Sequence, residues 1–262
     1  PGASLRASFR KSSPQLVHRG VETVACLPLL IGSPGLVERQ RRLDHGLLQG
    51  VDLGGTVGPR SAKAVAQGLA EKGIDLVDAP VSGGPSGAHK GTLTVMAAGA
   101  QAAQDEVWPL LEVFGKVFTI GQEAGQAQLL KLLNNMLSST AFAITAEAFV
   151  AGVKGGLDPK LMMDVINISS GRSAASQEKF VRQVLPRTFD FGFPISSICK
   201  DISLAIEECE ALGVPMWVGS QARQLWKFAL KQDGTGKDMT ELVTYLEQWS
   251  HATPPAPVEK SG

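Results

Sequence analysis

The densest glycine cluster in the chain, DAPVSGGPSGAHKGT, spans residues 78–92 and directly follows a predicted strand. Ser82, Gly83 and Gly84 stand at its centre, and glycine lets the backbone turn so that N–H groups converge on an anion. A carboxylate or a phosphate is the ligand that such a cradle would bind. Spacing alone leaves a tight structural turn as an equal alternative.

Two nucleotide-binding motifs come close to this cluster. The run from Ser82 to Gly87 reads Ser-x-Gly-x-x-Gly, one residue away from the dinucleotide fingerprint Gly-x-Gly-x-x-Gly. That fingerprint must open a helix, whereas we expect the next strand to begin within a few residues of Gly91, with no helix before it. His89 stands where a Walker phosphate loop needs glycine. The sequence therefore favours neither motif.

A polar stripe follows one face of a leucine-rich segment further along the chain. Lys131 and Asn135 are four residues apart, with Ala127 one turn before them and Ser138 and Ser139 one turn after. Residues at this spacing share one face of a helix. On this evidence alone, a lysine that extends to solvent from an amphipathic helix is the simpler interpretation.

A third candidate is the pair Lys200 and Asp201 near the start of a predicted helix, with Phe193 eight residues before the aspartate. An exposed ion pair of little energetic consequence is the default interpretation. The four histidines show no spacing typical of a metal site or a catalytic triad, and no Gly-x-Ser-x-Gly motif occurs. We therefore expect no metal.

Composition narrows the function classes. With 25 acidic and 25 basic residues the formal net charge is zero, so the basic footprint of a nucleic-acid binder is missing. The three scattered cysteines favour a reducing compartment. The longest apolar stretch that we noted, residues 24–31, is broken by Pro28 and is far shorter than the roughly 20 residues of a spanning helix. We expect small-molecule or protein partners, with no nucleic acid and no membrane.

The first half of the chain alternates short strands with helices, which is typical of a parallel sheet in an α/β domain. The predicted strands are 21–27, 49–53, 74–77, 93–98 and 116–120, and the predicted helices are 60–72 and 102–114. Residues 1–20 carry four basic residues and no acidic one, so we expect a disordered leader or a transit segment. The α/β domain is then 21–124.

After Gly125 the strand patterns stop, and a helical domain is expected over 125–250. Its first helix, 126–154, is unusually long and should end at Gly155 and Gly156, with Asp158 and Pro159 opening the next. Further helices are predicted at 158–167, 174–185, 198–212, 216–231 and 238–249. The proline-rich tail 251–262 is expected to be disordered.

Together these pieces resemble the β-hydroxyacid dehydrogenase family, which includes 3-hydroxyisobutyrate dehydrogenase and tartronate semialdehyde reductase. DAPVSGGPSGAHKGTLTVMAAG resembles the family's substrate-binding stretch, GQAQLLKLLNNML its catalytic helix and KDISLA its late lysine-aspartate motif. The resemblance extends over residues 51–249. It implies a Rossmann-like NAD(P)-binding domain followed by a helical domain like that of 6-phosphogluconate dehydrogenase.

The resemblance also implies roles for individual residues. Lys131 would be the general acid/base in hydride transfer between NAD or NADP and a short β-hydroxyacid or its semialdehyde. The implied substrate-binding residues are Ser82, Gly83, Gly84, Asn135, Phe193 and Asp201. The implied cofactor-binding residues are Leu27, Pro28, Thr56 and Lys200.

Two departures from the family pattern matter. Ala127 replaces the second glycine of a pair that precedes the catalytic lysine, which a helical backbone should tolerate. No Gly-x-Gly-x-x-Gly loop occurs in residues 1–50, and 21–28 resembles the family's fourth strand, so we expect a truncated Rossmann-like domain. The alternative function is therefore an incomplete remnant that binds a carboxylate or only oligomerises.

The resemblance further implies a small carboxylate substrate and a homo-oligomer, either a dimer or a tetramer. A cytoplasmic location is the default expectation, and the acid-free leader leaves a mitochondrial one open. The motifs specify neither the hydroxyacid nor the choice between NAD and NADP.

Overall fold

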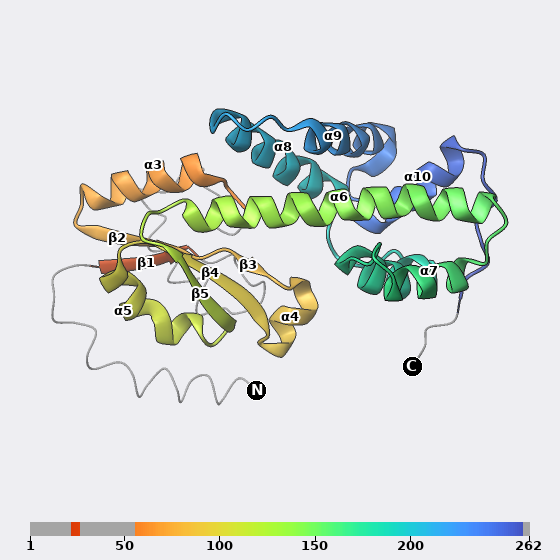
Figure 1. Cartoon of the computed structure of the whole chain (residues 1–262). Coiled ribbons are helices and arrows are strands. Elements are labelled where there is room, and N and C mark those ends of the chain that lie inside the picture. Colours follow the sequence, from red (N-terminus) through yellow and green to blue (C-terminus); the bar gives the residue numbers. More distant parts are fainter. Residues whose placement is uncertain (1–21, 27–55, 259–262) are drawn as a thin grey trace.

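The computed structural model describes residues 22–26 and 56–258. An α/β region is followed by a helical region, and the long helix α6, Gln126–Lys154, runs through both (Figure 1). The predicted leader, the predicted strand 49–53, Leu27 and Pro28 lie outside the described residues. The order of α/β and then helical structure agrees with the prediction.

Within residues 22–26 and 56–258, five strands form one mixed sheet. They are β1 Glu22–Cys26, β2 Ile74–Asp78, β3 Val81–Ser82, β4 Leu93–Ala98 and β5 Gly115–Gly121. β1 pairs with β2 and β4 with β5 in parallel, but β2 and β3 both run antiparallel to β4. The prediction of a parallel sheet is therefore wrong at this centre. The connection from β3 to β4 is too short for a parallel crossover, which needs a dozen or more residues.

Three helices lie in the described part of the α/β region, namely α3 Pro59–Ala70, α4 Gly84–Lys90 and α5 Gln101–Leu111. The first and third confirm the predicted helices 60–72 and 102–114, with ends shifted by one to three residues. The short helix α4 contradicts our expectation that no helix stands between the glycine cluster and the next strand. The absence of a side chain at Gly87 allows α4 to pack against Leu93, because a Cβ atom there would come within 3.1 Å of a Leu93 methyl group.

The two faces of β4 pack against different helices. Side chains alternate across a strand, so Val95 and Ala97 share one face and Met96 and Ala98 the other. The first pair belongs to a buried cluster with Leu111 of α5, and the second pair packs against Ala127 of α6. The sheet is thereby held between α5 and the first turn of α6 (Figure 1).

Each of the six predicted helices of the helical region is found, in the predicted order, with two of them divided into shorter helical elements. After α6 come α7 Pro159–Ile168, a π-wound helix Ala175–Val184, α8 Ile195–Ala211, α9 Trp217–Ala229, a π turn Leu230–Gly234, a 3₁₀ turn Met239–Glu241 and α10 Leu242–Trp249. The predicted helix 238–249 is thus divided at its first turn. Its N-cap Asp238 accepts from the N–H of Thr240 at 2.9 Å and completes a capping box with Glu241.

The end of α6 is as predicted from its glycines. Gly156 has φ +87°, a left-handed conformation that glycine adopts without strain. Asp158 then caps α7, since its Oδ1 accepts from the N–H of Leu161 at 2.7 Å, and Pro159 occupies the first turn.

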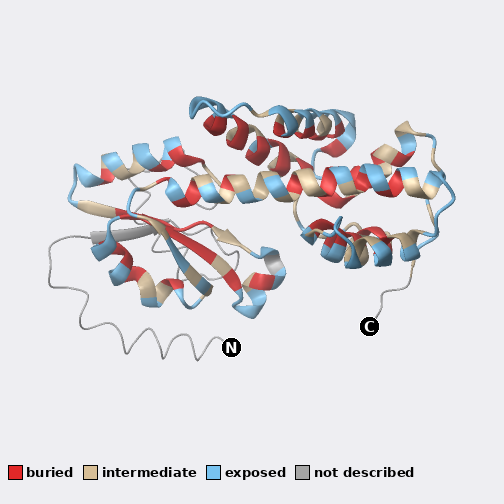
Figure 2. Ribbon diagram, in the orientation of Figure 1, coloured by how far each residue is buried: buried red, intermediate tan, exposed pale blue. Residues whose placement is uncertain are grey.

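Within the described residues, α6 is the one helix long and apolar enough to cross a membrane by length and composition, so the expectation that no stretch is longer or more apolar than residues 24–31 is wrong. Buried and exposed residues alternate along α6 (Figure 2). Its buried side chains pack against the sheet at one end and against the aromatic core of the helical region at the other. These contacts explain the apolar residues on its buried side, whereas Leu137 and Ile144 are exposed.

The helical core is dominated by aromatic rings. The ring centroids of Phe142 and Phe180 are 5.2 Å apart, those of Phe142 and Trp226 6.1 Å, and those of Phe149 and Phe180 5.4 Å. All four side chains are at most 1% exposed. Such offset aromatic contacts add to the stabilisation from burial.

The prediction of a disordered tail from His251 is wrong for residues 251–258. The N–H of Ala252 donates to the carbonyl of Glu247 at 2.9 Å, and that of Val258 donates to Leu185 at 2.9 Å. Both side chains pack against the helical core. These contacts hold the segment on the surface although its composition resembles a flexible tail.

Candidate active site

The beginning of α6 is anchored to the sheet by a buried carboxylate. Asp78, at the end of β2, accepts through Oδ2 from the N–H of Gly125 at 3.1 Å and of Gln128 at 3.0 Å. Burial raises the pKa of Asp78, an effect that these hydrogen bonds oppose. The first turn of α6, just before Lys131, is therefore fixed against the sheet.

Gln128, in the first turn of α6, also binds the segment that leads into α3. Its Oε1 accepts from the N–H groups of Val57 at 3.1 Å and Gly58 at 3.3 Å, just before α3. The segment that carries Thr56 is thus held beside the start of α6. Sequence reasoning missed Gln128 and did not assign Asp78 this role, because both act across about 50 to 70 residues.

Lys131 and Asn135 lie on one face of α6, as predicted, and Asp201 of α8 faces that surface. Asn135 Nδ2 donates to Asp201 Oδ2 at 2.7 Å. Asp201 is only 2% exposed, so this contact is shielded from water. Since a carboxylate only accepts, the bond fixes which side of the Asn135 amide faces Asp201.

The side chain of Lys131 is partly buried, and this environment changes its acidity. Burial lowers the pKa of Lys131 from its ordinary value, and the negative charge of Asp201 opposes that change. The interpretation of Lys131 as a fully solvent-extended lysine is therefore wrong. A lysine with a lowered pKa can accept and donate a proton closer to neutral pH.

Lys200 joins the two regions. Its Nζ donates to the carbonyl oxygen of Thr56 at 2.6 Å and lies 3.1 Å from Asp201 Oδ1. The expectation of an exposed ion pair is only half right, because the side chain of Lys200 is 48% exposed and that of Asp201 only 4%. One connected group thus contains five of the predicted site residues, namely Lys131, Asn135, Asp201, Lys200 and Thr56.

The glycine cradle lies at the end of β3 and the start of α4. Ser82 pairs with Thr94 of β4, Gly83 has φ +131°, and Gly84 has φ +62°. A Cβ atom at Gly83 would come within 3.0 Å of Leu93. The first N–H groups of a helix have no partner within that helix, and Pro85 has no N–H, so Gly84 and Ser86 are the candidate donors at the start of α4. Among the described contacts, none joins the cradle directly to Lys131 or Asp201.

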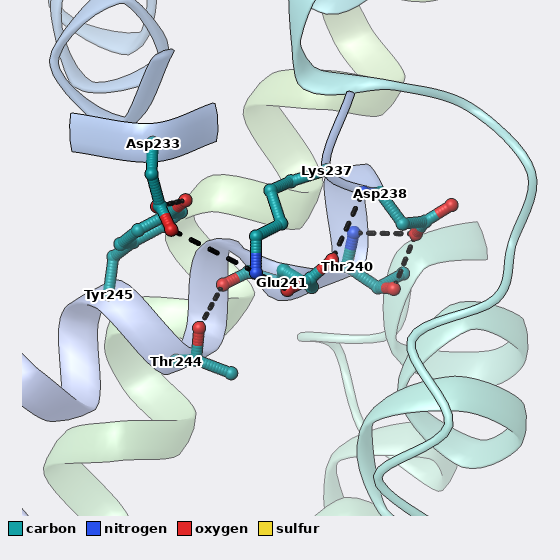
Figure 3. Close-up of polar contacts among 7 residues, drawn as sticks. All are labelled: Asp233, Lys237, Asp238, Thr240, Glu241, Thr244 and Tyr245. Atoms are coloured by element: carbon teal, nitrogen blue, oxygen red, sulfur yellow. Dashed lines mark hydrogen bonds and ion pairs between the residues drawn. The ribbon is translucent and has the colours of Figure 1, made fainter. Parts of the chain in front are cut away.

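The backbone at Phe193 is held by a polar cluster of the helical region that contains Asp238. Figure 3 shows Asp238 in this cluster with its contacts to Thr240 and Glu241. Asp238 Oδ2 accepts from the N–H of Gly192 at 2.7 Å and of Phe193 at 3.2 Å, and the N–H of Met239 donates to the Phe193 carbonyl at 2.8 Å. The same carboxyl group caps the 3₁₀ turn. The structure therefore explains how the Phe193 backbone is held, and its described hydrogen bonds are with this cluster and not with Lys131.

Two family models match the chain. Residues 40–121 match the NAD-binding domain of 6-phosphogluconate dehydrogenase, and residues 125–246 match the model described as NAD-binding of NADP-dependent 3-hydroxyisobutyrate dehydrogenase. The cofactor is accordingly NAD or NADP.

Similar proteins agree with this assignment. The 2-(hydroxymethyl)glutarate dehydrogenase of Eubacterium barkeri is 36% identical over 82% of this chain and 73% of its own length. The mitochondrial 3-hydroxyisobutyrate dehydrogenase of Mus musculus is 32% identical over 74% of this chain, which spans only 59% of that relative. The structure of Mycobacterium tuberculosis 3-hydroxyisobutyrate dehydrogenase with L-serine has 30% identity and a TM-score of 0.64, covering 73% of this chain and 67% of that one. This chain belongs to the β-hydroxyacid dehydrogenase family.

Proposed function

We propose that the protein transfers hydride between NAD or NADP and a short β-hydroxyacid or its semialdehyde, with Lys131 as the general acid/base. The observation that carries this proposal is the surroundings of Lys131. Its partly buried amine, with a lowered pKa, shares a helix face with Asn135, which Asp201 orients. Relatives of this chain bear the names of dehydrogenases that act on small hydroxyacids.

The residues beside Thr56 fit a nicotinamide cofactor. Lys200 supplies an ammonium donor and Thr56 a hydroxyl group, the kinds of group that bind ribose hydroxyls and a carboxamide. When bound, the oxidised cofactor supplies the acceptor for hydride. Leu27 and Pro28 remain predicted cofactor contacts outside the described residues.

In the oxidation direction the neutral amine of Lys131 takes the proton from the substrate hydroxyl as hydride leaves the carbon. Asn135 retains a second N–H and its carbonyl oxygen for the substrate, since one N–H is used by Asp201. Ser82, Gly83 and Gly84 bind the substrate carboxylate and so orient the reacting carbon. In reduction the ammonium of Lys131 returns the proton to the oxygen.

Replacing Lys131 tests the proposal. Lys131→Ala should lower kcat by about 100- to 10,000-fold, the usual contribution of a general acid/base, with cofactor binding preserved. Lys154→Ala removes an exposed lysine from the other end of α6 and should leave turnover unchanged. Turnover retained in Lys131→Ala would reject the assigned role.

A cofactor titration separates this proposal from the alternative of an incomplete remnant. NADH and NADPH are titrated against tryptophan fluorescence and the melting temperature, because a ligand that binds the native state raises that temperature. Saturable binding with stabilisation supports the dehydrogenase. A folded protein that binds neither cofactor supports a chain that only binds a carboxylate or oligomerises.

A further inference from the structure

A second lysine lies buried beside α6 and has no role in the proposed reaction. Lys179, on the π-wound helix Ala175–Val184, is only 6% exposed. Its Nζ donates to Ser138 Oγ at 3.2 Å and lies 4.8 Å from the centroid of the Phe191 ring. Both contacts orient the ammonium group, but neither partner carries a negative charge.

The absence of a carboxylate partner is unusual for a buried cation. Among the described residues, no ion pair includes Lys179, and the acidic group that acts on its charge is the neighbouring Glu178, which is exposed. Burial correspondingly lowers the pKa of Lys179. Buried charges in proteins are normally paired, so an anion bound beside Lys179 Nζ would favour the charged form that burial disfavours.

The position of Lys179 relates it to the proposed active site. Ser138 is seven residues after Lys131 on α6, and residues seven apart lie on nearly the same face, about 10 Å apart along the axis. The ammonium of Lys179 therefore stands two helical turns from Lys131 along the polar stripe. Phe191, beneath that ammonium, is in the same loop as Phe193.

We propose that Lys179 determines substrate specificity by binding a second anionic group of the substrate, so that the preferred β-hydroxyacid is a dicarboxylate. This inference rests on the proposed function for the position of the reacting hydroxyl. One carboxylate binds the glycine cradle at Ser82, Gly83 and Gly84, the hydroxyl faces Lys131, and the second carboxylate pairs with Lys179. Lys131 and Ser138, the hydrogen-bond partner of Lys179, are about 10 Å apart along the axis of α6, so the hydroxyl group and the second carboxylate should be separated by several bonds, as they are in a substituted glutarate.

A matched pair of ligands tests this inference. 3-Hydroxyisobutyrate and 2-(hydroxymethyl)glutarate share the carboxylate and the hydroxymethyl group, and the second replaces a methyl group by a carboxyethyl group. Calorimetric affinities for both are measured with the whole chain in the presence of NADP⁺. Since binding needs no turnover, failure of the dehydrogenase assay leaves this comparison intact.

We expect the dicarboxylate to bind about 10- to 100-fold more tightly than the monocarboxylate, as a charged hydrogen bond provides. Lys179→Gln should remove this preference, whereas Lys179→Arg, which keeps the charge, should retain it. Arg182→Gln removes an exposed positive charge from the same helix and should change neither affinity. Melting curves establish that each variant is folded.

Three results would overturn the inference. They are equal affinities of the unaltered chain for the two acids, failure to bind either acid, or a preference that survives in folded Lys179→Gln. The first two need no variant, so they decide the question even if the substitutions prevent folding.

Discussion

In the helical region Lys131 and Asn135 are placed by a single turn of α6, whereas in the α/β region Gly83 and Gly84 are placed by an antiparallel strand pair and a short helix. The first arrangement depends on residues four apart in the sequence. The second depends on pairing between β3 and β4 and on contacts with Leu93. The comparison shows that local helix geometry places the residues proposed for proton transfer, whereas tertiary packing places the proposed carboxylate cradle.

The two regions also differ in their cores. The helical region has one continuous aromatic cluster, whereas the α/β region divides its apolar residues between the two faces of the sheet. We therefore expect the helical region to contribute most of the stability of the described chain, and core substitutions there to have the largest effect.

Trp226→Ala should produce the largest loss of stability. Its side chain is fully buried against Phe142, and removal of a buried tryptophan costs about 3–5 kcal/mol of unfolding free energy. Trp217→Ala is the matched control, because that tryptophan is 79% exposed. Denaturant unfolding followed by circular dichroism measures both. Similar losses for the two variants would contradict the assigned core.

Asp78→Ala tests the joint between the two regions. It removes the acceptor for the N–H groups of Gly125 and Gln128, which should cost about 1–2 kcal/mol. Because the start of α6 is then released, we also expect kcat to fall although Asp78 takes no part in the proton transfer. Asp105→Ala, which removes an acceptor from the exposed side chain of Gln101, serves as a control. Unchanged melting of Asp78→Ala would show that the joint is unimportant.

Gly83→Ala should have a smaller effect on stability than Trp226→Ala and a specific effect on substrate binding. Its φ of +131° is unfavourable for alanine, and the added methyl group would press on Leu93, at a cost of about 1–3 kcal/mol. We expect KM for the hydroxyacid to rise while the affinity for NADH stays constant. Gly68→Ala, in α3 with open space around it, is the control. An unchanged KM would contradict the proposal that Gly83 takes part in binding the substrate carboxylate.

Sequence periodicity could predict most of the fold and the helical half of the site. α6, its terminal glycines and the shared face of Lys131 and Asn135 follow from spacing within one helix. The helix α4 could not be predicted, because the glycines in GPSGAHK oppose a helix and packing against Leu93 overrides that tendency, while Pro85 is accommodated in the first turn. The burial of Asp201 and the hydrogen bonds of Gln128 were equally hidden, since they depend on elements distant in the sequence.

The pH dependence of hydroxyacid oxidation in the unaltered protein and in Asp201→Asn tests the central claim about Lys131 most directly. Oxidation needs the neutral amine, so kcat/KM should rise with pH through the pKa of Lys131, at a pH below the ordinary lysine value. The Asp201→Asn substitution keeps an amide oxygen as acceptor for Asn135. It removes the negative charge that raises the pKa of Lys131, so the increase in kcat/KM should occur at a still lower pH. Two results would contradict Lys131 as the general base. They are an increase in kcat/KM at the ordinary pKa of lysine, and an increase that occurs at the same pH in Asp201→Asn as in the unaltered protein.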